Sequence, residues 1–241
     1  MTRSLNGKEL IERDLGILSE SENYLQYQFE KIESFVGRRI LEIGSGIGNH
    51  TKRLLNRRPE LLIALEKELI FCQEIEKQLG PEVEVLTVDL NDISAHEGSL
   101  RSKKIDTIIA LNVLEHVKED LACLRILSNV IVPGGRIIII VPAFAAIYSK
   151  LDKEYGHYRR YSKKIFKKYA DELGMELKIN SYFNIIGWFG WFIAAKIGRT
   201  AKINRKMMGL FDKLTPLLNA IEKVFPAMPF GLSLLGVFEK K

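Results

Sequence analysis

The sequence predicts an α/β protein in which a mostly parallel β-sheet is covered by helices on both faces. Three observations support this fold class. Short apolar runs of strand length recur along the first 142 residues, and segments long enough for crossover helices separate them. Of the 241 residues, 46% are hydrophobic, which is enough for a substantial core in a single domain. Because parallel neighbours need crossover connections, this alternation indicates a parallel sheet.

Five apolar runs have the length and composition of buried strands: 38–44, 60–66, 83–89, 105–112 and 135–142. The second is rich in leucine and is assigned from its position, whereas the other four are rich in β-branched residues. The segments between them predict helices at 50–56, 69–80 and 122–135. Turns at Gly80-Pro81 and Pro133-Gly134-Gly135 end the last two helices.

A glycine-rich turn follows the first predicted strand, in the segment "ILEIGSGIGNHT". Gly44, Gly46 and Gly48 leave the backbone open to close approach by a ligand, at the junction of a strand and a helix where nucleotides bind. Asn49 breaks the G-x-G-x-x-G spacing, which disfavours a nicotinamide dinucleotide. A plain tight turn is the alternative interpretation.

Carboxylates stand at the ends of three predicted strands: Glu42 beside the glycine turn, Glu66 after the second strand and Asp89 after the third. A carboxylate at the second strand end can accept hydrogen bonds from ribose hydroxyls. The other two can meet an ammonium group and an adenine amine. Each acid alone could be a helix cap or a surface residue. Together with the glycine turn, the three predict an adenosine-like ligand that carries a positive charge.

Several motifs carry a resemblance to a known family: "LEIGSGIGNHT", "ALE", "TVDLND", "LNVLEHV" and "PGG". In this order and spacing the chain resembles the class I S-adenosylmethionine-dependent methyltransferases along essentially its whole length. The resemblance implies one domain over 1–241 with a Rossmann-like sheet of seven strands. It also implies S-adenosylmethionine as cofactor and S-adenosylhomocysteine as product.

The subgroup it most resembles has "NYLQYQFEKI" before the glycine turn and "GHYRRYS" after the fifth strand. These are bacterial and archaeal small-molecule methyltransferases that often accompany polysaccharide or polyprenyl-linked sugar genes. The resemblance implies an N-terminal helical lid over 1–37, with Tyr24 closing over the cofactor. The alternative is that this segment only covers the edge of the sheet.

Carried over to this chain, the family's cofactor site implies these residues: Tyr24, Glu42, Gly44, Ser45, Gly46, Gly48, Glu66, Lys67, Asp89, Leu90, Asn112 and Val113. Glu42 would lie near the methionine ammonium, and the residues of the glycine turn would line the methionine and the ribose. Glu66 would bind the ribose hydroxyls, with Lys67 beside the adenine. Asp89 and Leu90 would hold the adenine edge, and Asn112 and Val113 would lie beneath the transferable methyl group.

The segment "LDKEYGHYRRYS" contains the candidate catalytic residues His157, Arg160 and Tyr161. It combines a general base with cations that can hold a carboxylate or phosphate, and it would lie above the methyl-donating end of the cofactor. His116 is a competing base. Alternatively, Arg159 and Arg160 pair with nearby acids and lock the loop. Because the four histidines are scattered without ligand spacing, we predict no metal site.

A long apolar and basic insertion, 184–231, is expected between strands at 175–183 and 232–240. Its uncharged run of 13 residues from Phe183 to Ala195 is too short for a transmembrane helix, which needs ~20. Two interpretations remain. The insertion is a helical cap on the sheet, or 184–206 touches the membrane surface through aromatic and basic side chains.

The distribution of charge and the two cysteines indicate the kind of partner and the cellular compartment. The net charge is +6, and residues 150–206 hold a surplus of nine basic residues, which favours an anionic partner or is simply a solvated face. Without a secretory leader, Cys72 and Cys123 are expected as free thiols in a reducing compartment, so we expect a cytoplasmic protein. If 184–206 touches the membrane, the protein would lie at its inner face.

The sequence therefore predicts a methyltransferase, with O-methylation of a sugar, a lipid-linked glycan or another small hydroxyl or carboxylate acceptor as the leading function. Nucleic acid is not expected as a partner, for two reasons. The segment after the fourth strand lacks a base-recognition motif, and no separate nucleic-acid module is visible in the sequence. The alternatives are an RNA or protein methyltransferase and a non-catalytic scaffold that binds the cofactor.

Overall fold

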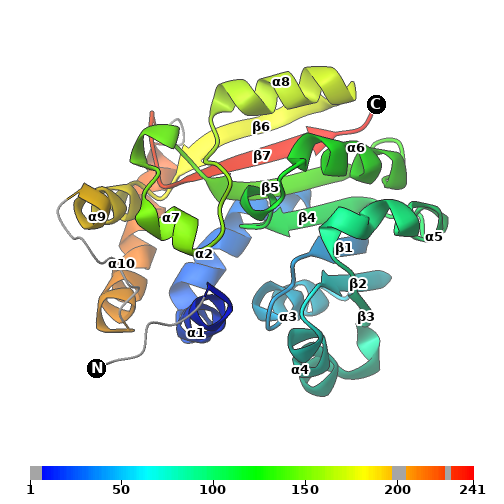
Figure 1. Cartoon of the computed structure of the whole chain (residues 1–241), viewed down its shortest axis with the longest axis horizontal. Helices are drawn as coiled ribbons and strands as arrows, with labels where there is room; N and C mark the ends of the chain where they lie inside the picture. The colour runs from blue at the N-terminus through cyan, green and yellow to red at the C-terminus, as the bar shows by residue number, and fades with distance from the viewer. Residues whose placement is uncertain (1–6, 197–204, 226–228) are drawn as a thin grey trace.

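Seven strands form a single sheet in the order β3-β2-β1-β4-β5-β7-β6 in the computed structural model, which describes residues 7–196, 205–225 and 229–241 (Figure 1). The strands are β1 Arg39–Ile43, β2 Leu61–Glu66, β3 Glu84–Thr87, β4 Thr107–Leu111, β5 Arg136–Pro142, β6 Glu176–Phe183 and β7 Ser233–Glu239. The first five run parallel, and β7 is antiparallel to β5 and β6. The predicted seven-stranded, mostly parallel sheet is confirmed.

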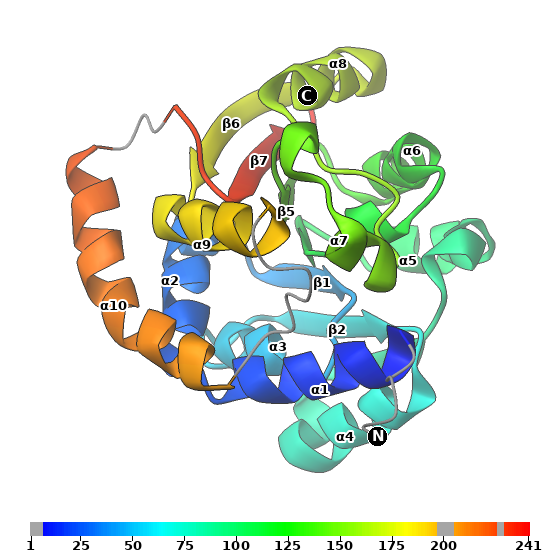
Figure 2. The same ribbon diagram turned by 60° about the vertical axis from the view of Figure 1, so that its left-hand side comes forward.

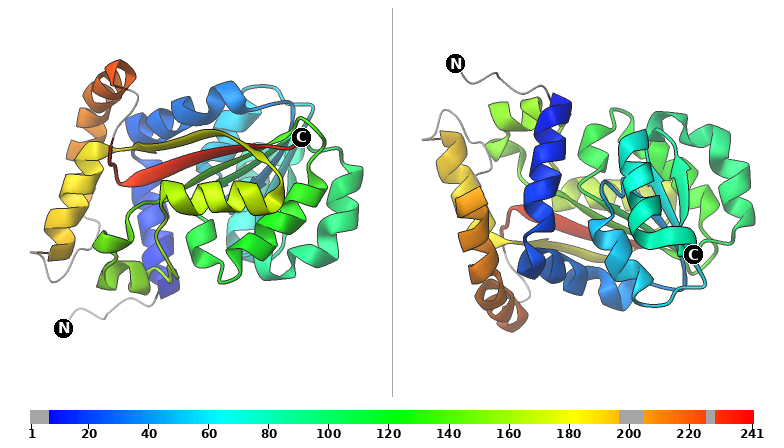
Figure 3. Two further views of the ribbon diagram at one scale, coloured as in Figure 1. Left: turned by 90° about the horizontal axis from the view of Figure 1, so that it is seen from above. Right: turned by 90° about the horizontal axis from the view of Figure 1, so that it is seen from below.

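Helices lie on both sides of this sheet (Figure 3). They are α1 Gly7–Ser19, α2 Glu22–Ile32, α3 Asn49–Leu55, α4 Leu69–Leu79, α5 Glu97–Ser102, α6 Asp120–Val130, α7 Lys150–Glu154, α8 Lys163–Leu173, α9 Ile185–Lys196 and α10 Arg205–Val224. Short 3₁₀ turns include η3 Leu90–His96, η4 Leu114–His116 and η5 Ala145–Ile147. The predicted helix at 122–135 is α6, which starts two residues earlier and ends at Val130.

Alternating side chains of the central strand β5 belong to two separate cores. Ile137 and Ile139 pack with side chains of α5, α6 and α8 on one face. Ile138 and Ile140 pack with side chains of α2, α3 and α10 on the other. Because both faces are covered, β5 is apolar at every position from Ile137 to Pro142, with four isoleucines in succession after Arg136.

The order of the strands reverses beside β1, since β2 lies on one side of it and β4 on the other. Parallel strands of this kind leave a crevice at their carboxyl ends where the connections diverge. The loops after β1, β2 and β4 all open at this edge, and they include the glycine turn and Asn112. The topology therefore places the predicted cofactor residues together.

Four helices, α1, α2, α9 and α10, form what we call the cap, at one end of the molecule (Figure 2). Its central contact is Glu222 of α10, which is 3% exposed and accepts hydrogen bonds from the Tyr27 hydroxyl at 2.6 Å and the Asn184 backbone N–H at 2.8 Å. Lys31 lies 3.0 Å from the same carboxylate. Glu222 thus ties α10 to α2 and to the end of β6.

No helix among the described residues is long and apolar enough to cross a bilayer. From the sequence, the uncharged run 183–195 was already too short to span a bilayer. Residues 197–204, which carry part of the basic segment considered for membrane contact, lie outside the described residues. Cys72 and Cys123 are both free and buried.

Candidate active site

The glycine turn after β1 adopts a conformation that side chains would disrupt. Gly44, Gly46 and Gly48 have φ of 67°, 56° and 87°, in the left-handed region that favours glycine. A Cβ on Gly44 would lie 2.5 Å from a methyl carbon of Val113. Gly48 is the N-cap of α3. The turn is therefore held open by backbone geometry, and one side of it is packed against the end of β4.

Glu66, at the end of β2, holds this turn in place. One carboxylate oxygen accepts the Gly46 N–H at 2.9 Å, and the other accepts the N–H groups of Lys67 at 2.8 Å and Glu68 at 3.0 Å. The side chain is nearly buried, with 7% of the residue exposed. Glu66 thus joins two loops that the sequence places 20 residues apart, and Oε2, which accepts only the Gly46 N–H, still has lone-pair capacity for a ligand hydroxyl.

Glu42 lies in β1 directly beneath the turn. It accepts a 2.6 Å hydrogen bond from the Thr51 hydroxyl and is 4% exposed. Burial raises the pKa of Glu42 to about 8, and the nearby charge of Glu66 adds to the rise, whereas the bond from Thr51 opposes it. A cationic ligand group beside this carboxyl would reverse the shift, because an opposite charge favours the ionised form.

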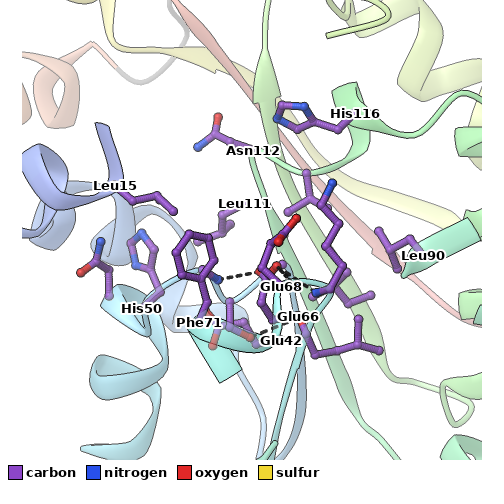
Figure 4. Close-up of a pocket in the computed structure, with 18 of the residues that line it drawn as sticks. Leu15, Glu42, His50, Glu66, Glu68, Phe71, Leu90, Leu111, Asn112 and His116 are labelled. Atoms are coloured by element: carbon purple, nitrogen blue, oxygen red, sulfur yellow. Dashed lines mark hydrogen bonds between the residues drawn. The ribbon is translucent and has the colours of Figure 1, made fainter. Parts of the chain in front are cut away.

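These residues line one pocket of about 400 Å³ at the carboxyl ends of the strands (Figure 4). Ten of the twelve predicted cofactor residues contribute to its wall: Glu42, Gly44, Ser45, Gly46, Glu66, Lys67, Asp89, Leu90, Asn112 and Val113. A pocket of this size is typical of a small-molecule or cofactor site. The structure therefore brings together residues that the motifs identified one by one.

The remaining two predicted residues do not line the pocket. Gly48 is the last glycine of the turn and the N-cap of α3. Tyr24 packs its ring 5.4 Å from that of Phe211, and its backbone N–H donates to Asp212 of α10 at 2.8 Å. Tyr24 therefore joins α2 to α10 within the cap, and the position predicted for it over the cofactor is not the one observed.

Asp89 and Asn112 occupy special backbone positions at the pocket. β3 ends at Thr87, two residues before the expected end, and Asp89 instead caps η3 by accepting the Asn91 N–H at 2.9 Å. Asn112 has φ of 55°, and its N–H donates to the Ile140 carbonyl at 2.7 Å. Its exposed side chain points into the open upper part of the pocket, near His116 (Figure 4).

Sequence reasoning missed the apolar wall of the pocket, which comes from Leu15 and Leu18 of α1, Leu25 of α2 and Phe71 of α4. Of these residues only Leu25 lies in a quoted motif, "NYLQYQFEKI", where no role was assigned to it. Their only sequence signal is the apolar face of an amphipathic helix, which equally predicts ordinary core packing. The N-terminal helices thus supply part of the pocket wall through leucines.

His50 at the start of α3 is another unpredicted wall residue, and its ring faces Gln28 of α2 at 3.4 Å. Burial, with a smaller effect of the charge of Arg53, lowers the pKa of His50 to about 3. Its ring is therefore neutral at physiological pH and contributes shape and polarity without charge.

The loop that contains the candidate catalytic residues is fixed by two buried aspartates. Asp152 accepts from the Arg160 Nε at 2.8 Å and lies 3.0 Å from the His157 Nδ1. Burial alone would raise the pKa of Asp152, but the hydrogen bond from His157 and the charge of Arg160 hold it below its ordinary value. Asp120 accepts from the Tyr161 hydroxyl at 2.7 Å and from Arg159 at 2.7 Å.

This geometry changes the roles of two candidate catalytic residues. Tyr161 is fully buried, and Arg160 is 3% exposed, with a second bond to the Ala143 carbonyl. Neither contributes to the pocket wall. Both side chains lock the loop, as the alternative interpretation held for the arginines, although Arg159 pairs with Asp120 and not with an acid of its own segment.

His157 and His116 lie side by side at the upper end of the pocket. Their ring centroids are 4.7 Å apart with nearly perpendicular planes, and His116 lines the pocket while His157 stands behind it. Burial, followed by the charges of His157 and Lys67, lowers the pKa of His116 to about 4. A neutral imidazole therefore faces the pocket, whereas His157 contacts His116 and does not line the pocket.

Comparison with known proteins agrees with this architecture. Residues 41–137 match a family model described as "Methyltransferase domain". The chain therefore carries a methyltransferase domain. A solved S-adenosylmethionine-dependent methyltransferase from Archaeoglobus fulgidus has the same fold, with a TM-score of 0.60 and 18% identity, over 91% of this chain and 94% of that one.

A second solved structure, of the plantazolicin methyltransferase BamL with a substrate analogue and S-adenosylhomocysteine, has a TM-score of 0.58 and 16% identity. It covers 96% of this chain and 88% of that chain. The predicted cofactor, S-adenosylmethionine, is supported by the matched domain and by this likeness. The domain is an S-adenosylmethionine-dependent methyltransferase domain of class I fold.

Among curated proteins, the chain resembles the tRNA U34 carboxymethyltransferase of Syntrophotalea carbinolica (strain DSM 2380 / NBRC 103641 / GraBd1). The two are 31% identical over 107 residues, which are 43% of this chain and 32% of that protein. Further relatives carry the same name. The chain spans about a third of the length of the curated relatives it matches.

These relatives correct two expectations. The leading prediction of a sugar or lipid-linked acceptor is wrong, because the similar curated proteins are named for a tRNA nucleotide. The expectation that nucleic acid is not a partner is wrong for the same reason. The sequence interpretation was misled because it took the absence of a separate nucleic-acid module as evidence against an RNA acceptor.

Proposed function

We propose that the protein transfers the methyl group of S-adenosylmethionine to an RNA acceptor. The observation that carries this proposal is the 31% identity, over 107 residues of the chain, to a protein named as a tRNA U34 carboxymethyltransferase. The pocket supports the cofactor half of the proposal. It combines a bare glycine turn, two buried carboxylates and a volume of about 400 Å³.

In this proposal the cofactor lies across the ends of β1, β2 and β4. Its ammonium group is placed beside Glu42, whose raised pKa a neighbouring cation would bring down. Its ribose hydroxyls donate to Glu66, and its adenine lies between Leu90 and Phe71. The methyl group then points towards Asn112 and His116, at the open end of the pocket.

Basic side chains around α8 support an anionic acceptor. Lys164, Lys167 and Lys168 are exposed along this helix, within the segment that holds the surplus of nine basic residues. Lys and Arg that neutralise phosphates supply most of the non-specific affinity of proteins for nucleic acid, and this affinity falls as salt rises. The RNA backbone would lie along this surface while a nucleotide reaches the pocket.

The transfer itself needs the acceptor atom roughly 3–3.5 Å from the methyl carbon and in line with the breaking bond to sulfur. The chain contributes by holding the cofactor and by shaping the opening beside Asn112 and His116. His116 borders the space left for the acceptor and is neutral at physiological pH, because burial lowers its pKa to about 4.

The test is to incubate the purified protein with S-adenosylmethionine labelled in the methyl group and with total tRNA. We expect label in RNA, and mass spectrometry of the digested nucleosides then identifies the modified base and separates a methyl group from a carboxymethyl group. Glu66→Ala should reduce the label. Transfer to protein but not to RNA, with the cofactor bound, would contradict the proposal.

We also propose a place at the cytoplasmic face of a membrane, through the outer side of α10. Exposed apolar residues follow one another there at helical spacing: Met207, Leu210, Leu214, Leu217, Ile221 and Val224. The exposed Lys213 stands beside this row and suits anionic lipid. The helix lies at the outer edge of the cap (Figure 2).

Sedimentation with vesicles of anionic or zwitterionic lipid tests this location. We expect binding to the anionic vesicles and its loss in a Leu210→Glu, Leu217→Glu double variant, which changes only exposed positions. Equal recovery of both proteins in the supernatant would refute membrane contact. A change of oligomeric state in the double variant would instead assign the row to contact between copies of the chain.

A further inference from the structure

Three potential metal ligands meet beside the pocket. One ligand atom each from Glu115, His116 and His157 lies within 4.8 Å of the others. The first two belong to η4 after β4, and His157 comes from the loop after α7. A 2.7 Å hydrogen bond from the Tyr158 N–H to the Glu115 carbonyl joins the two segments. The juxtaposition is thus built by the backbone and does not depend on side chains alone.

Glu115 gives the second, independent sign of a ligand. The residue is 1% exposed, and its Oε2 has no hydrogen-bond partner among the described residues. A buried carboxylate oxygen without a partner is costly, by at least a few kcal/mol when the group is charged. Arg160 lies close enough to interact electrostatically, but its own hydrogen bonds go to Asp152 and the Ala143 carbonyl.

His157 has the orientation of a metal-binding histidine. Its Nδ1 faces the buried Asp152 at 3.0 Å, so with the proton on Nδ1 the lone pair of Nε2 is available. Metal-bound histidines almost always donate their second ring N–H to a carboxylate, a carbonyl or water. Asp152 is itself fixed by Arg160 and by Ser149. The histidine is therefore held in one orientation before any ion arrives.

We propose that Glu115, His116 and His157 bind a divalent first-row transition-metal ion at the methyl-transfer end of the pocket. Two imidazoles and one carboxylate suit zinc, manganese or ferrous iron, and they leave coordination positions open. With ligand bonds of about 2.1 Å, the ligand atoms of a tetrahedral ion lie roughly 3.4 Å apart, so these three atoms, now within 4.8 Å of one another, would draw together by up to about 1.4 Å when an ion binds.

The open positions face the pocket, because His116 is the ligand that lines it. An ion here could coordinate an oxygen or nitrogen of the acceptor and orient it towards the methyl group. This role rests on the proposed methyl transfer, whereas binding of the ion does not. The three ligands have no local spacing in the sequence, because His157 stands 41 residues after His116 and only the fold brings them together.

Binding is tested on the full chain without cofactor or RNA, so that its outcome is independent of the proposed function. Manganese is titrated while electron paramagnetic resonance measures the free ion, and calorimetry repeats the titration with zinc. We expect one ion per chain. His157→Ala should weaken binding at least 10-fold, and Asp152→Asn should weaken it about 10–100-fold by releasing the His157 ring.

His96→Ala is the matched control, because this histidine ends η3 away from the three ligands and should leave ion affinity unchanged. Circular dichroism shows whether each variant is folded, and His116→Ala offers a second ligand variant should His157→Ala fail to fold. The proposal is overturned if the folded wild type binds neither manganese nor zinc, or if His157→Ala and His116→Ala bind as tightly as the control.

Discussion

The cofactor-binding half of the molecule, residues 41–137, and the cap use different kinds of contact. In the first, the turn is shaped by glycines, and Glu66 reaches Gly46 across 20 residues within one βαβ unit. In the cap, Glu222 meets Tyr27 across 195 residues and Asn184 across 38. Sequence motifs therefore identify the contacts of the first region. The contacts of the cap join residues far apart in the sequence, so only the complete fold reveals them.

The largest effect should come from the cap. Glu222→Ala removes the acceptor for Tyr27, Asn184 and Lys31 in a buried site, so the free energy of unfolding should fall by about 3–5 kcal/mol. Urea denaturation measures it. Lys213→Ala, an exposed change on the same helix, is the control and should stay within about 0.5 kcal/mol. A loss below 1 kcal/mol in Glu222→Ala would show that the cap is held by other contacts.

The cofactor half should respond to pH through Glu42. Its pKa is about 8 in the folded protein against an ordinary value of 4.5, so folding favours the protonated form. The stability is fully present below pH 4.5 and is lost as pH rises towards 8, by an amount on the order of 2–4 kcal/mol. Glu42→Gln, which stays neutral, should flatten this dependence.

Chemical denaturation of both proteins without cofactor, at several values between pH 5 and 8, checks the prediction. If the wild type and Glu42→Gln lose stability in parallel, the carboxyl of Glu42 is ionised in the fold and its place beneath the turn gives it no special environment.

A smaller effect is expected on ligand affinity. Glu66→Ala should weaken S-adenosylmethionine binding by about 1–3 kcal/mol, because ribose hydroxyls lose their acceptor and the Gly46 N–H loses its tether. Calorimetry measures the affinity, with Glu76→Ala on the exposed side of α4 as control. Unchanged affinity in Glu66→Ala would show that the ribose of the cofactor does not bind at the end of β2.

The smallest expected effect distinguishes a structural role of Tyr161 in the loop from a catalytic one. Tyr161→Phe removes one hydrogen bond to Asp120, which also accepts from Tyr169, so stability should fall by about 1 kcal/mol. Methyl transfer per folded molecule should stay the same. A large loss of transfer rate at unchanged stability would restore the catalytic role that the sequence suggested for Tyr161.

The sheet and most of the cofactor pocket were predictable because their signals are local. The G-x-G-x-G turn needs positive φ at Gly44, Gly46 and Gly48, and glycine is the residue type that favours this conformation. The acids at strand ends follow from the topology of parallel strands. Even so, Asp89 lies beyond the end of β3 and caps η3, because only four residues of that segment pair with β2.

The loop and the cap were harder to predict because their chemistry depends on distant partners. Nothing in "GHYRRYS" shows that Asp120, 41 residues before Tyr161, accepts its hydroxyl, or that Asp152 holds Arg160. Tyr24 has the spacing of a lid residue, yet its partners Phe211 and Asp212 lie in α10. The acceptor was assigned from gene association within a resembling subgroup, which no residue of the chain encodes.

Calorimetry of the purified wild type with S-adenosylmethionine and S-adenosylhomocysteine tests the central claim most directly, with Gly44→Ala measured beside it. The account predicts one binding site per wild-type chain for each compound. It also predicts loss of binding in Gly44→Ala, because a Cβ there would meet Val113 at 2.5 Å in a positive-φ turn. A folded wild type that gives neither heat nor a shift in melting temperature with either compound would contradict it.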